Sequence, residues 1–279
     1  MKPTAYYDGC FSDIDSVRIP LSDRAYFFGD AVYDAALGRN GKPFMLDSHI
    51  ARFKRSASLI GLKMPISDTD LRDILARLTE SLSGSFFFLY FQLSARGKAR
   101  AHARDSSLRP ALFATVSEIK DPAANPPARL ICREDKRYKL CNVKTINLLP
   151  AVLASTEAEE LGADEAVFVK DGTVTECAHS NIHIIKNERL FTHPEGSSIL
   201  SGISRAHLLE VCKRLGVSAH EKPFTKDELL SADEVLITSS SKIARRVSEI
   251  DGKSFPLKET TVGFSIYSAM LADFYSSTV

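Results

Sequence analysis

The sequence predicts an α+β protein built from two domains. Residues 49–62 have apolar side chains at helical spacing, whereas Asp171-Gly172 lies between two alternating apolar segments and is typical of a β-hairpin turn. Helices mixed with hairpins favour α+β over a regularly alternating parallel sheet. Residues 120–127 contain three prolines within six positions. Such a segment predicts an extended, non-helical linker between an N-terminal domain, 1–119, and a C-terminal domain, 128–279.

The N-terminal domain is expected to contain two helices and two central strands. The first helix is the amphipathic segment 49–62, and the second spans 67–82 with Ser67 as its N-cap. The aromatic-rich segment 86–94 and the segment 111–117 are expected to be strands.

The C-terminal domain is expected to begin with a strand near Leu130. Its helices and strands are predicted from periodicity, turn residues and caps, and Gly162 is expected just after the end of the first helix. These elements are helices at 150–161, 203–215 and 264–275, and strands at 165–169, 173–176, 183–185, 189–192 and 235–238.

Composition excludes several functional classes. The 36 basic and 35 acidic residues give a net charge of +1, which argues against a protein that mainly coats nucleic acid or a membrane. The longest apolar run, 86–91, is too short to span a bilayer. The five cysteines form no C-x-x-C pair and the N-terminus has no apolar signal-like segment, so a cytoplasmic location is expected.

Most familiar cofactor and metal motifs are missing. There is no G-x-G-x-x-G, no G-x-x-x-x-G-K-[ST] and no H-E-x-x-H. His179 and His183 are four residues apart, but they lie in a strand-like segment without a third ligand nearby, so no metal site is predicted.

Four short segments could carry chemistry, although each is weak alone. Lys144 lies among apolar residues, where an amine can become nucleophilic, but it is one of many lysines. Glu176 follows a strand and could keep a heterocyclic nitrogen protonated. Gly202 opens a helix whose N–H groups could bind an anion, and the Ser239-Ser240-Ser241 cluster follows a buried strand and could bind phosphate oxygens.

The order and content of these segments resemble the fold-type IV pyridoxal-phosphate enzymes. Two N-terminal segments agree. Residues 24–34, RAYFFGDAVYD, are similar to the family's R-x-x-x-F-G-D-x-V-Y-E, and 49–52, HIAR, are similar to its H-x-x-R. The resemblance runs from about Asp8 to the last strand. It implies a smaller N-terminal α/β domain and a larger C-terminal domain with a barrel-like sheet that is mixed or antiparallel.

Within the family, residues 92–102, QLSARGKARAH, resemble the Q-x-T-R-G-x-x-x-R-x-H segment of D-amino-acid aminotransferases. The resemblance implies that Arg100 and His102 bind the substrate carboxylate. It also implies a homodimer in which this loop reaches in from the second subunit. The expected reaction moves an amino group from a D-amino acid such as D-alanine or D-glutamate to a 2-oxo acid.

The resemblance further assigns roles around the pyridoxal 5'-phosphate cofactor. Lys144 would join its aldehyde as a Schiff base and shuttle a proton, Glu176 would pair with the ring nitrogen, and Tyr33 would orient substrate beside the lysine. The residues implied to bind the phosphate are Arg52, Ile203, Ser204, Ser239 and Ser240.

Some positions depart from the family pattern. Asp34 replaces a glutamate, Ala99 replaces a common proline, and Cys177-Ala178-His179 replaces Gly-Ser-Ser. They leave open which side chain of the amino acid is preferred.

Alternative readings remain. Other activities of the same family are L-branched-chain transamination, R-amine transamination and the aminodeoxychorismate lyase reaction. The basic run from Arg129 to Lys144 could bind nucleic acid, although Glu134 and Asp135 interrupt it and a solvated face explains it better. An inactive homologue is a third reading, against which the retained lysine and acid argue.

Overall fold

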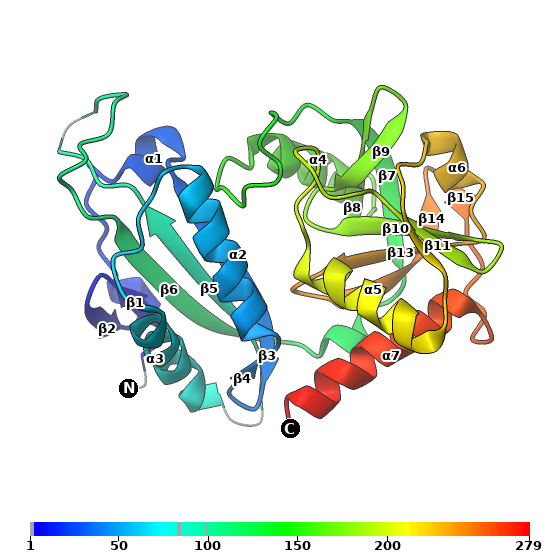
Figure 1. The fold of residues 1–279 in the computed structure, drawn as a ribbon, viewed down its shortest axis with the longest axis horizontal. Coiled ribbons are helices and arrows are strands. Elements are labelled where there is room, and N and C mark those ends of the chain that lie inside the picture. Colours follow the sequence, from blue (N-terminus) through cyan, green and yellow to red (C-terminus); the bar gives the residue numbers. More distant parts are fainter. Residues whose placement is uncertain (1–2, 83–84, 99) are drawn as a thin grey trace. The chain divides into compact units, whose positions relative to one another are not determined.

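The computed structural model describes residues 3–82, 85–98 and 100–279, which form two compact units (Figure 1). Unit 1 comprises Met1–Asp121, Val143–Asn147 and Ser277–Val279, and unit 2 comprises Pro122–Asn142 and Leu148–Ser276. The chain therefore returns to unit 1 at 143–147, the segment that carries Lys144. Ala99, one of the departures from the family pattern, lies outside the described residues.

Unit 1 is an antiparallel sheet with strand order β2-β1-β6-β5-β3-β4. Its longest pairing joins β3 to β5 from Ala31 opposite Ser94 to Arg39 opposite Phe86. The elements of unit 1 are β1 (Ala5–Tyr7), β2 (Cys10–Ser12), η1 (Ile14–Ser16), α1 (Arg24–Phe28), β3 (Ala31–Arg39), β4 (Lys42–Pro43), α2 (Leu46–Leu59), α3 (Asp68–Thr79), η2 (Glu80–Leu82), β5 (Phe86–Ser94) and β6 (Ala111–Ile119).

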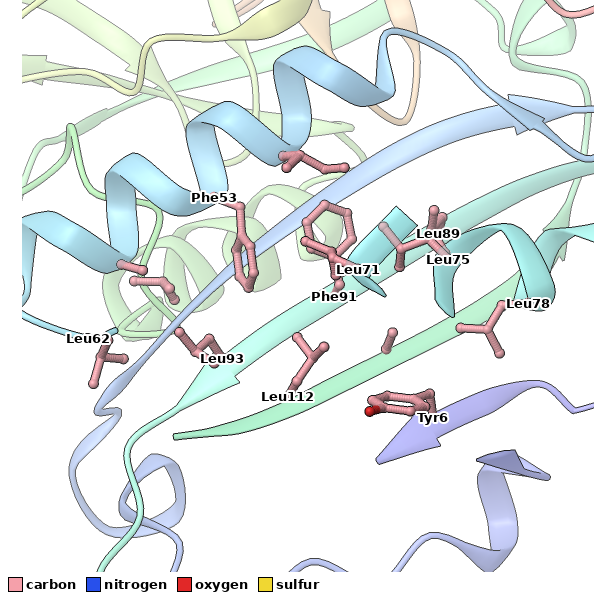
Figure 2. Packing of buried hydrophobic residues seen from close by; sticks show 14 of the residues in the cluster. Tyr6, Phe53, Leu62, Leu71, Leu75, Leu78, Leu89, Phe91, Leu93 and Leu112 are labelled. Atoms are coloured by element: carbon pink, nitrogen blue, oxygen red, sulfur yellow. The ribbon is translucent and has the colours of Figure 1, made fainter. Parts of the chain in front are cut away.

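The core of unit 1 lies between this sheet and helices α2 and α3. Alternate residues of β5 are buried because successive side chains of a strand point to opposite faces. Phe91 of β5 contacts Phe53 of α2 edge to face, with ring centroids 4.9 Å apart. Figure 2 shows Phe53 of α2 and Leu75 of α3 directed toward these strands.

The local signals that predicted these elements act as expected. Ser67 accepts a hydrogen bond from the Asp70 N–H and Asp70 accepts one from the Ser67 N–H, so a capping box starts α3. Strand 86–94 has the predicted bounds, whereas the first helix begins three residues earlier than predicted, at Leu46. Strand β3, which carries Tyr33 and Asp34, was not predicted from the sequence.

Unit 2 is a mixed sheet of nine strands that curls into a half-barrel. The strand order is β12-β11-β10-β13-β14-β7-β8-β9, with β15 beside β14. Three pairs are parallel and the others are antiparallel. The elements are η3 (Pro122–Ala124), β7 (Ala128–Glu134), α4 (Leu149–Glu160), β8 (Glu165–Lys170), β9 (Thr173–Cys177), β10 (Asn181–Lys186), β11 (Arg189–Thr192), α5 (Ile203–Leu215), β12 (Ala219–Glu221), α6 (Lys226–Leu230), β13 (Glu234–Ser239), β14 (Ile243–Ile250), β15 (Lys253–Ser254) and α7 (Val262–Ser277).

The predicted hairpin at 170–172 joins β8 to β9. Asp171 and Gly172 have φ angles of 50° and 78°, and positive φ at both central residues is what a tight hairpin turn requires. Gly162 has a φ of 70° directly after the C-cap of α4, as expected for a residue that ends a helix.

The linker is not extended throughout. Pro122–Ala124 form the 3-10 turn η3, so the expectation of a fully non-helical connector was wrong at these residues. Proline fits the first position of a helical turn because the N–H it lacks would have no partner there. The Asn125 side chain donates to the Pro122 carbonyl at 2.9 Å and closes the turn.

Core packing in unit 1 can be tested at Leu75, which is fully buried. Replacing it in a Leu75→Ala variant leaves a cavity, and the free energy of unfolding of unit 1 should fall by about 2–5 kcal/mol in urea titrations. Leu59→Ala is the matched control because Leu59 is 54% exposed, and it should change stability by less than about 0.5 kcal/mol. Equal effects of the two substitutions would contradict this packing.

Candidate active site

In unit 1, Lys144 lies on a short segment that runs beside β3. The Tyr33 N–H donates to the Lys144 carbonyl at 2.9 Å, and the Lys144 N–H donates to Ser56 Oγ at 3.2 Å. Val143 and Thr145 are buried, while Lys144 is half-buried. The Lys144 Nζ lies 4.4 Å from the centre of the Tyr33 ring. The structure therefore brings together the amine and the phenol that the resemblance placed side by side.

A buried carboxylate lies next to this pair along β3. Asp34 is fully buried and accepts hydrogen bonds from Arg52 Nε and Nη2, both at 2.8 Å. His49 Nδ1 lies 2.7 Å from Asp34 Oδ1. Burial alone would raise the pKa of Asp34, but the charge and hydrogen bonds of Arg52 hold it well below its usual range. Burial lowers the pKa of His49.

The structure places the predicted phosphate ligand Arg52 in this ion pair, a partner that the sequence analysis did not assign. Asp34 is one of the departures from the family pattern. Its carboxylate nevertheless accepts hydrogen bonds from two guanidinium nitrogens of Arg52 and so fixes the plane of that guanidinium.

Arg100 and His102 lie on an exposed loop between β5 and β6. The Arg100 guanidinium carbon is 5.3 Å from the centre of the Phe28 ring, and the His102 ring is 5.4 Å from the same ring. Within the described part of the chain, these two side chains contact α1 rather than Tyr33 or Lys144.

In unit 2, Glu176 occupies a buried position near the end of β9. It forms an ion pair with Arg137. Asn181 Nδ2 donates to Oε2 at 3.1 Å, and the Leu200 N–H lies 3.1 and 3.2 Å from the two carboxylate oxygens. These donors fix the orientation of the carboxylate and stabilise its charged form.

Arg137 is a functional candidate that the sequence analysis missed. Its guanidinium also donates to both oxygens of Asp135, at 2.9 and 2.8 Å, and lies 4.7 Å from the centre of the Phe168 ring. Burial would lower the pKa of Arg137, but Asp135 and Glu176 raise it. The basic run from Arg129 to Lys144 was predicted to be a solvated face. That prediction was wrong for Arg137, whose side chain is only 13% exposed. Asp135 two residues earlier was the available signal.

The start of α5 and the end of β13 meet in unit 2. Ser204 Oγ donates to the Ser239 carbonyl at 3.0 Å, and Ser239 Oγ lies 3.3 Å from Ser241 Oγ. Gly202 is the N-cap, and no side chain caps the first turn, which begins at Ile203. Amides at such a helix start, next to several hydroxyls, can bind an anion.

Gly202 also allows a close approach of two segments. A Cβ built there would lie 1.9 Å from Asn181 Oδ1, so no other residue fits without movement. Asn181 in turn donates to both Glu176 and the Leu200 carbonyl. The structure therefore links the predicted acid to the helix start that was predicted to bind phosphate.

Comparison with known proteins decides the family. The family model described as amino-transferase class IV matches residues 31–250. A D-alanine aminotransferase of Bacillus licheniformis is 37% identical over 251 residues, covering 89% of this chain and 88% of the relative. One of Staphylococcus epidermidis is 31% identical over 252 residues, covering 89% of both chains.

The chain belongs to the class IV aminotransferases.

The fold of this class IV aminotransferase agrees with that assignment. A branched-chain aminotransferase of Thermoproteus uzoniensis has a TM-score of 0.90 at 21% identity, with 99% of this chain and 95% of that chain covered. A fold IV-transaminase of Curtobacterium pusillum has a TM-score of 0.82 at 20% identity, covering 94% and 92% of the two chains. The predicted α+β, fold-type IV architecture is confirmed. In the described residues, no helix of this aminotransferase has the length and apolar character needed to cross a bilayer.

A buried histidine contacts Thr238, the residue before Ser239, and its protonation state can be tested. His183 lies between Thr192 Oγ1 and Thr238 Oγ1, 2.9 Å from each, and is fully buried. Burial, with the nearby charge of Arg205, lowers the pKa of His183 from 6.5 to about 3.

Between these two values the unfolded chain binds a proton at this histidine that the folded chain does not bind. The free energy of unfolding should therefore fall as the pH decreases from 6.5 toward 3, with a slope of at most about 1.4 kcal/mol per pH unit from this group. In urea titrations across this range, His183→Gln should show a shallower slope than wild type. His220→Gln is the matched control, because the same substitution is made there at an exposed position. A His183→Gln slope equal to wild type would contradict a neutral buried histidine.

Proposed function

We propose that the protein is a pyridoxal-phosphate-dependent D-amino-acid aminotransferase that transfers the amino group of D-alanine or D-glutamate to a 2-oxo acid. The observation that carries the proposal is the 37% identity, over 89% of the chain, to a D-alanine aminotransferase. The Arg100-x-His102 segment supports the same substrate class, because both side chains can bind a carboxylate.

The residues of each unit fit the cofactor. In unit 1, the half-buried Lys144 would bind its aldehyde, and Arg52 would contact its phosphate. In unit 2, the Ile203 and Ser204 amides at the uncapped start of α5, with the hydroxyls of Ser239 and Ser240, would bind the phosphate. When bound, pyridoxal phosphate supplies an electron sink for negative charge at the substrate Cα.

Glu176 fits a protonated ring nitrogen. Its carboxylate is buried, oriented by the Leu200 N–H and Asn181, and paired with Arg137. A fixed negative charge beside the pyridine nitrogen would keep that nitrogen protonated and so would strengthen the electron sink.

The remaining groups of unit 1 would handle substrate. The Lys144 amine would take the proton from Cα of the donor and give it to the carbon that carried the cofactor's aldehyde oxygen. Tyr33, whose ring lies 4.4 Å from the amine, would orient the substrate beside it. Arg100 and His102 would bind the α-carboxylate and so determine which face of Cα meets the lysine.

We also propose a homodimer in which this loop serves the partner's site. In the described residues the Arg100 and His102 side chains contact Phe28 of their own subunit rather than its lysine, in keeping with that arrangement. Exposed apolar side chains support an interface: Leu149, Val152 and Leu153 share one face of α4 and are 54–67% exposed.

A cytoplasmic location is part of the proposal. All five cysteines are free thiols, and burial raises the pKa of Cys132, Cys177 and Cys212, which keeps them unreactive. Free thiols are typical of proteins in a reducing compartment.

A donor panel tests the reaction. Purified enzyme loaded with cofactor should lose its visible absorbance on addition of D-alanine or D-glutamate and recover it with 2-oxoglutarate. Values of kcat/KM for L-leucine and for a simple R-amine should be at least about 100-fold lower than the value for D-alanine. A preference for L-leucine or the R-amine, or release of 4-aminobenzoate from aminodeoxychorismate, would replace the proposal by another class IV activity.

The lysine has its own variant. Lys144→Ala should reduce kcat for D-alanine by at least about 10²–10⁴-fold, because it removes the group that moves the proton. Its absorbance should shift to that of unattached cofactor. Lys253→Ala is the matched control, because Lys253 is exposed on β15 and outside the proposed site, and it should retain both properties of wild type. Visible absorbance unchanged in Lys144→Ala would exclude Lys144 as the attachment residue.

The carboxylate assignment is tested at Arg100. An Arg100→Ala variant should lower kcat/KM for D-alanine by roughly 10–100-fold, since a hydrogen bond between charged groups is lost. Arg109→Ala is the control, because Arg109 lies in the same connection but pairs with Asp8 at 3.1 Å. Equal kcat/KM values in the two variants would remove Arg100 from the substrate site.

A further inference from the structure

The segment Arg24-x-x-x-Phe28-Gly29-Asp30 identified the family, yet none of the roles described so far uses Arg24, Phe28 or Asp30. Arg24 is the first residue of α1 and only 5% exposed. Its N–H donates to the Ala95 carbonyl at 3.0 Å, and Asp23 caps the helix by accepting from the Ala25 N–H at 2.8 Å. Both contacts fix the position from which the Arg24 side chain extends.

The Arg24 guanidinium holds the backbone of the Arg100–His102 loop. Its Nη2 donates to the His102 carbonyl at 2.8 Å, and its Nη1 donates to the carbonyls of Ala101 and, at 3.5 Å, Ala103. Three consecutive carbonyls thus converge on one side chain. These loop carbonyls lie outside a β-sheet, and the Arg24 guanidinium supplies hydrogen-bond donors to them.

Phe28 forms an apolar platform under the same loop. Its ring faces three groups: the guanidinium carbons of Arg24 and Arg100, at 4.7 and 5.3 Å, and the His102 ring, at 5.4 Å. Contact of a guanidinium with an aromatic face restricts the rotamers of a long side chain. The two residues proposed to bind the substrate carboxylate therefore rest on the same ring.

Asp30 fixes the network from the other side. It accepts from Arg24 Nε at 2.7 Å and from Arg104 Nε at 2.9 Å, and Arg104 also donates to the Ile60 carbonyl. Burial would raise the pKa of Asp30, but the two arginines lower it, so its charge persists at neutral pH. The loop is thereby anchored both at residues 101–103 and at residue 104.

We propose that Arg24 is a positioning residue that holds the 100–104 loop in the conformation in which Arg100 and His102 receive the substrate carboxylate. The effect on substrate binding rests on the proposed function, whereas the contacts between Arg24 and the loop do not depend on it. An arginine is needed because its planar fork reaches Asp30 and several carbonyls at once, whereas a lysine ammonium is a single point of donation.

The kinetic test compares Arg24→Lys with Arg109→Lys, the same chemical change outside the network. With Arg24→Lys, KM for D-alanine and for 2-oxoglutarate should rise about tenfold or more, because a small misplacement of binding groups is costly. The value of kcat should stay within about threefold of wild type, since Lys144 and the cofactor contacts are untouched. Cofactor absorbance should also equal that of wild type. Arg109→Lys should leave all these values unchanged.

A second measurement requires no activity. Trypsin cleaves after arginine, so the rate of cleavage after Arg100, followed by mass spectrometry on the loaded enzyme, reports the mobility of the loop. Cleavage there should be about tenfold faster or more in Arg24→Lys than in wild type or Arg109→Lys. Phe28→Leu is the second variant and serves if Arg24→Lys fails to fold, because it leaves no buried charge unpaired. It should accelerate the same cleavage and raise the same KM values, to a smaller extent.

The outcomes separate this inference from the proposed function. If cleavage after Arg100 is as slow in Arg24→Lys and Phe28→Leu as in wild type, the positioning role is overturned. If cleavage accelerates and KM does not change, the loop does not bind substrate and the inference fails at that step. If wild type does not transaminate D-alanine, the proposed function fails, while the cleavage rates still decide whether Arg24 holds the loop.

Discussion

The candidate site depends on a buried carboxylate paired with an arginine. Asp34 has no exposed surface, and its charge would be costly there without the two hydrogen bonds from Arg52. The pair joins β3, the strand that carries Tyr33, to helix α2. The backbone hydrogen bond from Tyr33 to Lys144 then aligns the lysine segment with the same strand. A charge pair thus defines the frame in which the amine is placed.

An acidic side chain paired with an arginine occurs at two other places in the structure. Glu176 is paired with Arg137 in unit 2, and Asp30 is paired with Arg24 and Arg104 in unit 1. In each case the arginine has a further set of contacts, which are Asp135 and Phe168 for Arg137 and the loop carbonyls for Arg24. A guanidinium offers five donors in a fixed plane. A single side chain can therefore neutralise a buried acid and also fix the orientation of a neighbouring segment.

Local signals predicted many of the elements. The Ser67 capping box, the Asp171-Gly172 hairpin and the alternating strand 86–94 depend on residues close together in the chain, and all are present. The family and the residues for the proposed site came from the order of short motifs. What escaped prediction depends on distant contacts. Arg137 was interpreted as a surface charge because Asp135 alone does not require burial, and its second partner, Glu176, is 39 residues away. The return of 143–147 to unit 1 is likewise fixed by β3. The turn at Pro122 differs from the prediction because proline, which disrupts a helix interior, is compatible with the first position of a helical turn.

Gly29 connects two of these features. It adopts a φ of 62° at the end of α1, its carbonyl accepts from Asn147 Nδ2 at 2.9 Å, and an added Cβ would lie 2.3 Å from Asn147 Oδ1. Even a single methyl group at this position would press on the Asn147 side chain, three residues after Lys144, although Gly29 and Asn147 are 118 positions apart in the chain. Laboratory evolution that diversifies the 100–104 loop should therefore leave this glycine unchanged, because a side chain there would disturb the segment that carries Lys144 as well as the end of α1.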